Sequence, residues 1–456
     1  MAETLDRGFL KNHLEDKKKH DVGKVVDVLP FLSKRTRAVR DNFNKVLGEY
    51  VRNINSLQLT NKEIQGAQMA EHVNFKEFVA EHDFKRFISQ YLFEHEEIKP
   101  IHSYLFNYLK VDDKNSNEFK KYAQFMSDTL SQGNQQIKDI FLDKTSDNIL
   151  TELILSQLEP LKESKRKDQQ YELLFPPLIK NYQEDLIFLS KHKEYFLGSF
   201  PLLTHFYTFM YAVQVITMFS RFTNGSSDDI KPFYFGLDWE AFSKRRKAAD
   251  EFEGYKFVRE QSKNLFPHIH TISHLSHNAL NNERESGNLA FIPYGKLYKM
   301  ISDKGKEFED AFLYELKAWI QDYKNLPFTK VTTNDDSSTL PEAFKILFNC
   351  LREGTSSGVS EKFGGNIEDL GYNQFTKVRG NLGTVFNLKH DFVLLLTAVC
   401  VKDERIPLNQ LFAEYEKRGV ALDRYSKKEI VKLFDNLNIL DKKSDSGDAQ
   451  YVKPIL

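Results

Sequence analysis

Four histidines within one ten-residue stretch are the densest group of possible metal ligands in the chain. They are His268, His270, His274 and His277. Imidazole is the commonest metal-binding side chain, and in a helix the last three would share one face. However, a metal site needs three or four converging donors, and no Cys, Asp or Glu lies between His268 and Glu283. We therefore expect a polar helix packed on another element, with metal binding as the alternative.

The triplet Asp229-Ile230-Lys231 has the residue types of a nuclease site. Nucleases of the restriction class often hold magnesium with acidic groups, and a lysine neutralises the leaving phosphate. Such triplets also arise by chance in a chain with 28% charged residues. A metal-dependent nuclease that uses Asp229, Lys231 or the histidines is therefore an alternative reading, and we expect no catalytic residue here.

Two further motifs lack the context that their chemistry requires. Residues 354–358 match the G-x-S-x-G nucleophile elbow, which needs a strand before Ser356 and a helix after it. The preceding apolar residues have helical spacing, and the glycines up to Gly365 predict a loop. No Gly-Lys pair is followed by Ser or Thr, so a phosphate-binding loop is missing. We predict no cofactor.

Four short basic runs could neutralise phosphates, although each also fits a solvated helix face. They begin at Lys17, Lys34, Lys165 and Lys244. The last consists of Lys244, Arg245, Arg246 and Lys247, and it follows two aromatic residues. Because cations and aromatic rings together suit nucleic acid, we include this run among the candidate DNA contacts.

The C-terminal part of the chain predicts two consecutive helices. Leu408, Leu411, Phe412 and Tyr415 recur with helical spacing, and Gly419 follows as an end signal. In the second helix we expect a capping box of Ser426 with Glu429 and a hydrophobic staple of Tyr425 with Ile430. The buried face is predicted to consist of Ile430, Leu433, Phe434 and Leu437.

A hairpin is predicted to follow these helices. Residues 439–442 and 450–453 read as short strands about a turn that contains Gly447. An apolar helix over residues 392–401 precedes the whole pattern. The order helix, helix, helix, hairpin predicts a winged helix over about residues 391–456.

In a winged helix the second helix of the pair commonly enters the DNA major groove. The face predicted to point away from the core carries Lys428, Lys432 and Asn436, which could meet phosphates and base edges. Further candidate contacts are Arg424 and Lys427 at the helix start, and Lys442 and Lys443 on the hairpin. Asp435, Asp445 and Asp448 would repel phosphate, so docking to another protein is the alternative.

The remainder of the chain predicts a mainly α protein with an irregular helical body. We divide it into a helical region 1–195, a mostly helical region 196–335 with one aromatic strand near 232–239, and a C-terminal region 341–456. Tyr195–Ser220 contains no charged residue, but its Gly, Pro and polar residues favour a buried helix over a membrane span. Cys350 and Cys400 sit in apolar runs, as expected of reduced residues in a cytoplasmic protein.

Net charge is −1 over 456 residues, so any DNA site must be local. Two passages then carry a family resemblance. They are residues 233–240 (FYFGLDWE), and residues 442–452 (KKSDSGDAQYV) with the preceding Arg418-Gly419 and Asp423-Arg424. Together with the chain length, these passages resemble the DptG family of DNA phosphorothioation-dependent restriction proteins.

The resemblance implies a bacterial cytoplasmic subunit that works with DptF and DptH, which carry the nucleotide-hydrolysing and nuclease parts. Together they would attack DNA that lacks sulfur in its backbone. No catalytic motif comes with the resemblance. We expect a non-catalytic subunit of this antiviral defence complex that binds double-stranded DNA and its partners and no membrane, with a nuclease subunit or a scaffold without DNA contact as alternatives.

Overall fold

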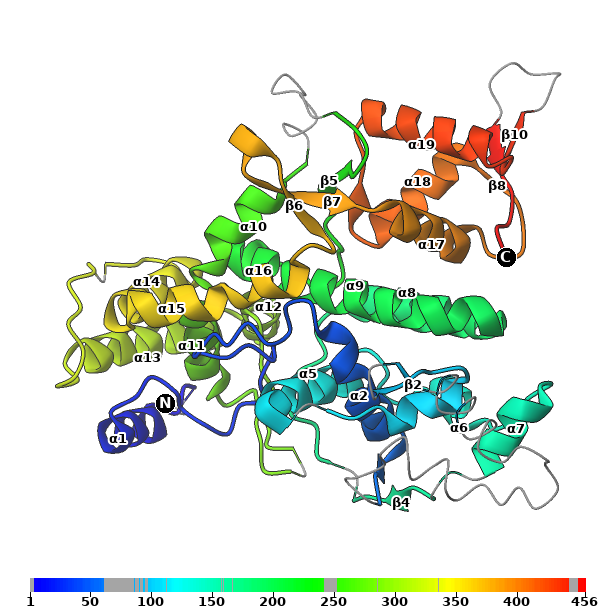
Figure 1. Cartoon of the computed structure of the whole chain (residues 1–456). Coiled ribbons are helices and arrows are strands. Elements are labelled where there is room, and N and C mark those ends of the chain that lie inside the picture. Colours follow the sequence, from blue (N-terminus) through cyan, green and yellow to red (C-terminus); the bar gives the residue numbers. More distant parts are fainter. Residues whose placement is uncertain are drawn as a thin grey trace.

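A long buried helix lies at the centre of the computed structural model, and the other elements surround it (Figure 1). This helix, α9 (Lys193–Ser220), has nearly every side chain from Phe206 to Phe219 buried. Among the described residues it is the one helix long and apolar enough to cross a membrane, and 89% of its most apolar window is buried inside the fold. The predicted buried helix is therefore confirmed.

The structure describes residues 4–60, 86, 90, 93–94, 97–111, 113–156, 158, 160–165, 167–241, 252–284, 286–334, 336–442 and 450–456. It is 57% helical, which confirms the mainly α class. The helical spacing of Phe75, Phe78 and Val79, and that of Phe84, Phe87 and Ile88, predicts two further helices, and these residues lie outside the described ranges.

The N-terminal elements lie on one side of α8 and α9 (Figure 1). The helical spacing of Val39, Phe43, Val46, Leu47 and Tyr50 predicts a helix here with Ser33 as its cap. The predicted cap is wrong, because Arg37 and Asp41 adopt positive φ angles of 63°, and helical structure begins only at Phe43. The elements are α1 (Arg7–Lys17), η1 (Phe43–Val46), α2 (Leu47–Asn55), β1 (Leu57–Gln58), β2 (Phe93–Glu94), β3 (Glu97–Ile98), η2 (Ser103–Tyr108), η3 (Asp113–Asn115), α5 (Ser116–Thr129), α6 (Gln135–Leu142), α7 (Ile149–Ser156) and β4 (Lys162–Glu163).

The central part of the chain contributes α9, its neighbour α8 and most of the remaining helices. The sequence also predicts a helix over residues 242–260. Residues 242–251 of this prediction lie outside the described ranges, and the described part contains α10, which begins at Tyr255. The elements are α8 (Pro176–Ser190), η4 (Phe222–Asn224), β5 (Phe233–Leu237), α10 (Tyr255–Ser262), α11 (Leu265–Ser276), α12 (Tyr294–Ser302), α13 (Lys306–Lys324), α14 (Leu340–Gly354), α15 (Ser357–Gly364) and α16 (Asn366–Gly371).

The predicted glycine loop is wrong, because residues 357–371 form α15 and α16. Here the glycines allow close packing. A Cβ atom on Gly364 would lie 2.1 Å from the carbonyl oxygen of Ser262, and one on Gly371 would lie 2.5 Å from the Phe209 ring. Glycine thus lets these short helices approach α10 and α9 more closely than any other residue would.

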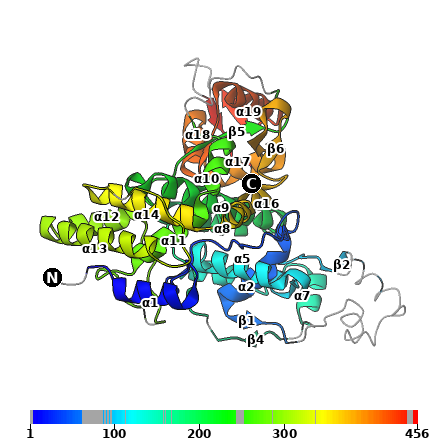
Figure 2. The same cartoon turned by 90° about the vertical axis from the view of Figure 1, so that its left-hand side faces the viewer.

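The C-terminal part stands on the opposite side of α8 and α9 from the N-terminal elements (Figures 1 and 2). Its α17, α18 and α19 confirm the three predicted helices, and its last two strands confirm the hairpin. The elements are β6 (Thr376–Val378), η6 (Gly380–Leu382), β7 (Thr384–Leu388), α17 (His390–Val401), β8 (Ile406–Pro407), α18 (Leu408–Lys417), β9 (Val420–Ala421), α19 (Arg424–Asn436), β10 (Leu440–Lys442) and β11 (Gln450–Val452).

Two small sheets hold the C-terminal part together. The first has the strand order β10-β11-β8, with β11 antiparallel to both neighbours. The second has the order β6-β7-β5-β9. In it, the predicted aromatic strand β5 is buried along its whole length and pairs in parallel with both β7 and β9. A strand from the centre of the sequence therefore joins the C-terminal helices to the body.

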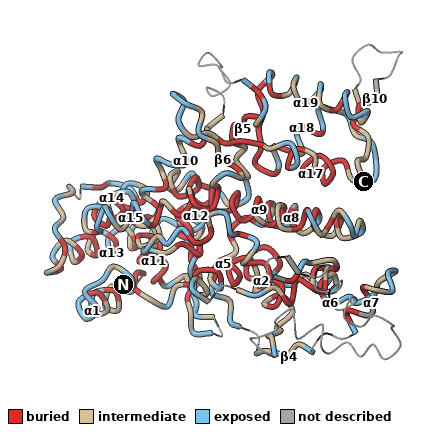
Figure 3. Tube along the Cα trace, in the orientation of Figure 1, coloured by how far each residue is buried: buried red, intermediate tan, exposed pale blue. Residues whose placement is uncertain are grey.

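One hydrophobic core extends through all three predicted regions of the chain, from Leu5 to Val452 (Figure 3). The predicted boundary between residues 335 and 341 lies between α13 and α14, which pack against each other. The regions are segments of sequence that share this core.

Candidate nucleic-acid interface

The outer face of α19 carries the basic residues that the sequence singled out. Arg424, Lys428, Lys432 and Asn436 are all exposed, and so is Asp435. The opposite face is anchored by Ile430 and Phe434, which are fully buried. Figure 3 shows α19 at the edge of the molecule. The helical period therefore places these polar groups toward solvent, as predicted.

Two predictions about apolar residues of α19 were wrong, one for the buried face and one for the hydrophobic staple. Leu437 is 44% exposed, because α19 ends at Asn436 and the chain turns there. Tyr425 is 43% exposed and so forms no hydrophobic staple; instead, its ring lies under the guanidinium of Arg424, 4.7 Å away. An exposed tyrosine and arginine at one end of α19 extend its polar outer face.

The predicted capping box is also wrong, because α19 begins earlier than expected. Asp423 is the N-cap, and its carboxylate accepts hydrogen bonds from the backbone N–H of Tyr425 (2.9 Å) and Ser426 (2.7 Å). Ser426 is buried, and its hydroxyl donates to the Glu240 carboxylate at 2.9 Å. A carboxylate cap also stabilises the positive end of the helix dipole.

The cations of α19 differ in how far they are neutralised. Lys432 lies 2.7 Å from Glu429 in an exposed ion pair, which is weak and open to exchange with phosphate. Lys427 is half-buried and lies over the Phe412 ring at 5.1 Å, so it belongs to the helix packing more than to the outer face. Within the described residues, Lys428 has no carboxylate partner, so its full charge is available to a ligand.

The remaining predicted DNA contacts lie at or beyond the ends of the described segments. Lys442 is the last residue of β10, and its neighbour Lys443 lies outside the described residues, as do Asp445 and Asp448. Lys244, Arg245, Arg246 and Lys247 also lie outside them. Because Glu240 accepts the hydrogen bond from Ser426, the chain leads into this basic run from a point beside the N-terminus of α19.

Buried polar contacts fix the position of α19 on the body. Tyr234 of β5 donates a hydrogen bond to Asp423 at 3.2 Å. Arg379, which follows β6, donates to the backbone carbonyls of Leu237 (2.6 Å) and Glu240 (2.9 Å) at the end of β5. Sequence reasoning did not identify these residues as a group, because they are far apart along the chain.

A buried ion pair ties the C-terminal part to α8. Arg418, 2% exposed, donates to both oxygens of the fully buried Asp185 at 2.7 and 2.8 Å. Tyr207 of α9 donates a third hydrogen bond to Asp185 at 2.6 Å. The bidentate geometry satisfies both buried charges and sets the orientation of the chain where α18 leads into β9.

The histidine cluster is structural rather than a ligand set. In α11, His268 hydrogen-bonds to the Tyr294 hydroxyl (3.1 Å), while His274 and His277 reach the backbone carbonyls of His20 (3.0 Å) and Gly23 (3.3 Å). Burial lowers the pKa of His268 to about 3 and that of His270 to about 4. The part of the chain that the structure describes contains no group of three or more potential metal ligands.

Of the other residues considered for catalysis, Asp229 and Ser356 are exposed and Cys400 is a buried free thiol. Asp229 is exposed and paired with Lys231. Ser356 lies between two helices, α14 and α15, so the strand required by a nucleophile elbow is missing. Burial raises the pKa of Cys400 to about 12, which keeps this thiol protonated.

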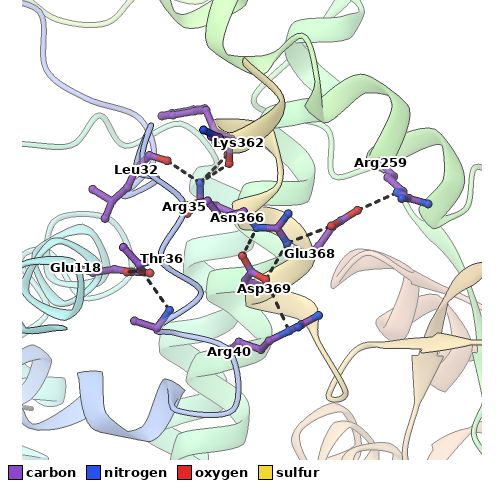
Figure 4. Close-up of polar contacts among 12 residues, drawn as sticks. Leu32, Arg35, Thr36, Arg40, Glu118, Arg259, Lys362, Asn366, Glu368 and Asp369 are labelled. Carbon is purple, nitrogen blue, oxygen red and sulfur yellow. Dashed lines mark hydrogen bonds and ion pairs between the residues drawn. The ribbon is translucent and has the colours of Figure 1, made fainter. Parts of the chain in front are cut away.

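The basic run that begins at Lys34 forms ion pairs with α16 (Figure 4). Arg35 binds Asp369, which is 1% exposed, and also Glu368 at 3.1 Å. Arg40 stacks on the Tyr372 ring at 3.5 Å and approaches Asp369 at 3.7 Å. These arginines fasten the N-terminal segment to α16, so they are not free to bind phosphate.

Comparison with known proteins does not assign the chain to a family. No protein-family model and no curated protein matches the chain.

Proposed function

We propose that this protein is a non-catalytic DNA-binding and assembly subunit of a bacterial phosphorothioation-dependent restriction complex. The observation that carries the proposal is the exposed face of α19, with Arg424, Lys428, Lys432 and Asn436, next to an antiparallel hairpin. In residues 390–452 the order is helix α17, strand β8, helix α18, the two-residue strand β9, helix α19 and a hairpin. Apart from β9, which pairs with β5, this is the order of a winged helix. In such modules the last helix reads the major groove and the hairpin contacts the backbone.

The contacts between β5 and α19 support the assignment to a DptG-like subunit. The first passage with family resemblance lies beside the residues that precede the second one. The backbone N–H of Phe233 donates to the carbonyl of Gly419 at 2.9 Å, and the Tyr234 hydroxyl donates to Asp423 at 3.2 Å. These contacts are what supports treating the quoted residues as parts of one structural unit. DptF and DptH are the partners that this assignment implies.

The test compares binding with cleavage. The purified chain is incubated with labelled duplex DNA, and separately with plasmid and magnesium or manganese. We expect a mobility shift that weakens steeply with salt and an intact plasmid. Cleavage that disappears in Asp229→Ala would replace the proposal by a metal-dependent nuclease. If the labelled DNA shows no mobility shift at any salt concentration, the proposal is replaced by a scaffold protein that does not contact DNA. Co-purification with DptF and DptH tests the assembly role separately.

A further inference from the structure

A polar pocket of about 350 Å³ lies on the far side of the molecule from α19. It is bounded by α2, α5, the start of α6 and the segment after β4. Figures 1 and 2 show α2, α5 and β4 on one side of α8 and α9, and α19 on the other. A cavity of this size is at the lower end of the range for small-molecule sites, about 300–1,000 Å³.

The walls of the pocket are held at both ends. Asp128, 7% exposed, accepts hydrogen bonds from the backbone N–H of Gln170 (2.8 Å) and Tyr171 (3.1 Å). At the other end, the backbone N–H of Ser164 donates to the carbonyl of Ser56 at 2.8 Å, next to the paired strands β1 and β4. The segment that closes the pocket is therefore anchored before and after it, as a preformed site requires.

Two buried polar atoms without a hydrogen-bond partner belong to residues that line the pocket. The side chain of Gln124 is 5% exposed; its amide nitrogen binds Asp128 at 2.7 Å, and its Oε1 has no hydrogen-bond partner. Nδ2 of Asn53, a buried donor, also has none. Because buried polar groups lose free energy when they are unpaired, a ligand that offers hydroxyl groups to this acceptor and this donor would be favoured.

The rim of the pocket is basic. Lys138, Lys165 and Lys167 line it together with Asp128 and Asp168, so the lysines outnumber the carboxylates. Lys167 donates to the Asn53 side chain at 3.1 Å and also lies 3.6 Å from Glu49. The side chains of Lys138 and Lys165 form no hydrogen bond or ion pair with any described residue, so both can meet an anion. Lys165 and Lys167 are the first and last residues of the basic run 165–167, which is not part of the proposed DNA interface.

We propose that this pocket binds a small sugar phosphate. The lysines would hold the phosphate, and the amides with the hydroxyls of Ser127 and Ser131 would hold the sugar hydroxyls. Among the described residues that line the pocket there is no aromatic ring, so none of them would stack on a nucleobase. The free metabolite and the 5′-phosphorylated end of a DNA strand share this chemistry.

The test is calorimetric titration of the full chain with ribose 5-phosphate, ribose and inorganic phosphate. Ribose 5-phosphate should bind at least about tenfold more tightly than either fragment, because it uses both halves of the pocket. Replacing Lys138 and Lys165 by Glu should weaken it by about a hundredfold or more, since each lost charge-assisted hydrogen bond costs about tenfold or more in affinity. Lys296→Glu with Lys299→Glu, two exposed lysines of α12 outside the pocket, carries the same charge change and should bind as the original chain does.

The source of the ligand is distinguished with a short DNA strand. A 5′-phosphorylated strand that displaces ribose 5-phosphate, where the unphosphorylated strand does not, supports a DNA end as the ligand. Failure of both strands to displace it supports the free sugar phosphate. Absence of ribose 5-phosphate binding at millimolar concentration, or equal binding by the Lys138/Lys165 variant, would overturn the proposal. Neither result bears on DNA binding by α19, so the two sites are tested independently.

Discussion

Lowering the pH from about 7 to about 5 is expected to destabilise the protein severely, because five buried histidines are held neutral. Burial lowers the pKa of His268 and His274 to about 3. It lowers the pKa of His205, His270 and His277 to about 4. The unfolded chain binds these protons near pH 6.5, so the stability is present above that pH and is lost as the pH falls toward the folded values.

The expected magnitude is large compared with total stability. At pH 5 each such histidine would cost about 2 kcal/mol, or about 10 kcal/mol for the five, and typical domains have only about 5–15 kcal/mol. One opposing group is Asp128, whose pKa burial raises to about 6. It binds a proton more readily in the folded chain, and it offsets about 1 kcal/mol at that pH.

Thermal unfolding followed by circular dichroism at several pH values measures this effect. His205→Gln provides the internal comparison, since an amide can still donate to the Leu370 carbonyl that His205 contacts at 2.6 Å. The variant should show a shallower loss of stability between pH 6.5 and pH 5, by up to about 1.4 kcal/mol per pH unit. A midpoint that stays constant from pH 7 to pH 5 would contradict the buried, neutral state of these histidines.

The second large effect is expected from Asp185→Ala, which removes the fully buried carboxylate from Arg418 and leaves this buried charge paired only with the partly exposed Glu414 at 3.0 Å. Breaking a buried pair in this way costs about 3–5 kcal/mol. Replacing both residues, as Asp185→Leu with Arg418→Met, should recover most of that loss, because no unpaired charge then remains. Guanidinium denaturation of the single and double variants gives both values.

An exposed pair provides the matched control for this experiment. Lys24 and Glu283 lie 3.3 Å apart, and their side chains are 52% and 58% exposed. Glu283→Gln should change stability by less than about 1 kcal/mol, as is usual for surface pairs. Equal losses in Asp185→Ala and Glu283→Gln would show that the pair between α8 and the C-terminal part does not stabilise the fold.

Local patterns predicted the elements of the C-terminal part well. Leu411 and Tyr415 mark α18 through their helical spacing, and β10 and β11 follow from alternating strands about a polar turn. The outer face of α19 was also predictable, because Ile430 and Phe434 define the buried side of one helical period. Such signals lie within a few residues of one another, so they can be read from sequence.

The errors arose where distant segments meet. Ser426 and Asp423 are both good helix caps, and only the buried Glu240, 186 residues away, commits the Ser426 hydroxyl to another contact. Glycines near Gly364 suggested a loop because sequence does not reveal the close approach of the Ser262 carbonyl. In each case tertiary contacts decided between local alternatives that were nearly equal in free energy.

The most direct test of the central claim is the salt dependence of duplex DNA binding in the variant Lys428→Glu with Lys432→Glu. Both side chains are exposed, so folding should be unaffected, as circular dichroism can check. Loss of two phosphate contacts should weaken binding and flatten the plot of log affinity against log salt by about 1.8. Lys296→Glu with Lys299→Glu, two exposed lysines on α12, carries the same charge change and should leave the slope intact. An unchanged slope in the Lys428/Lys432 variant would contradict DNA binding by α19.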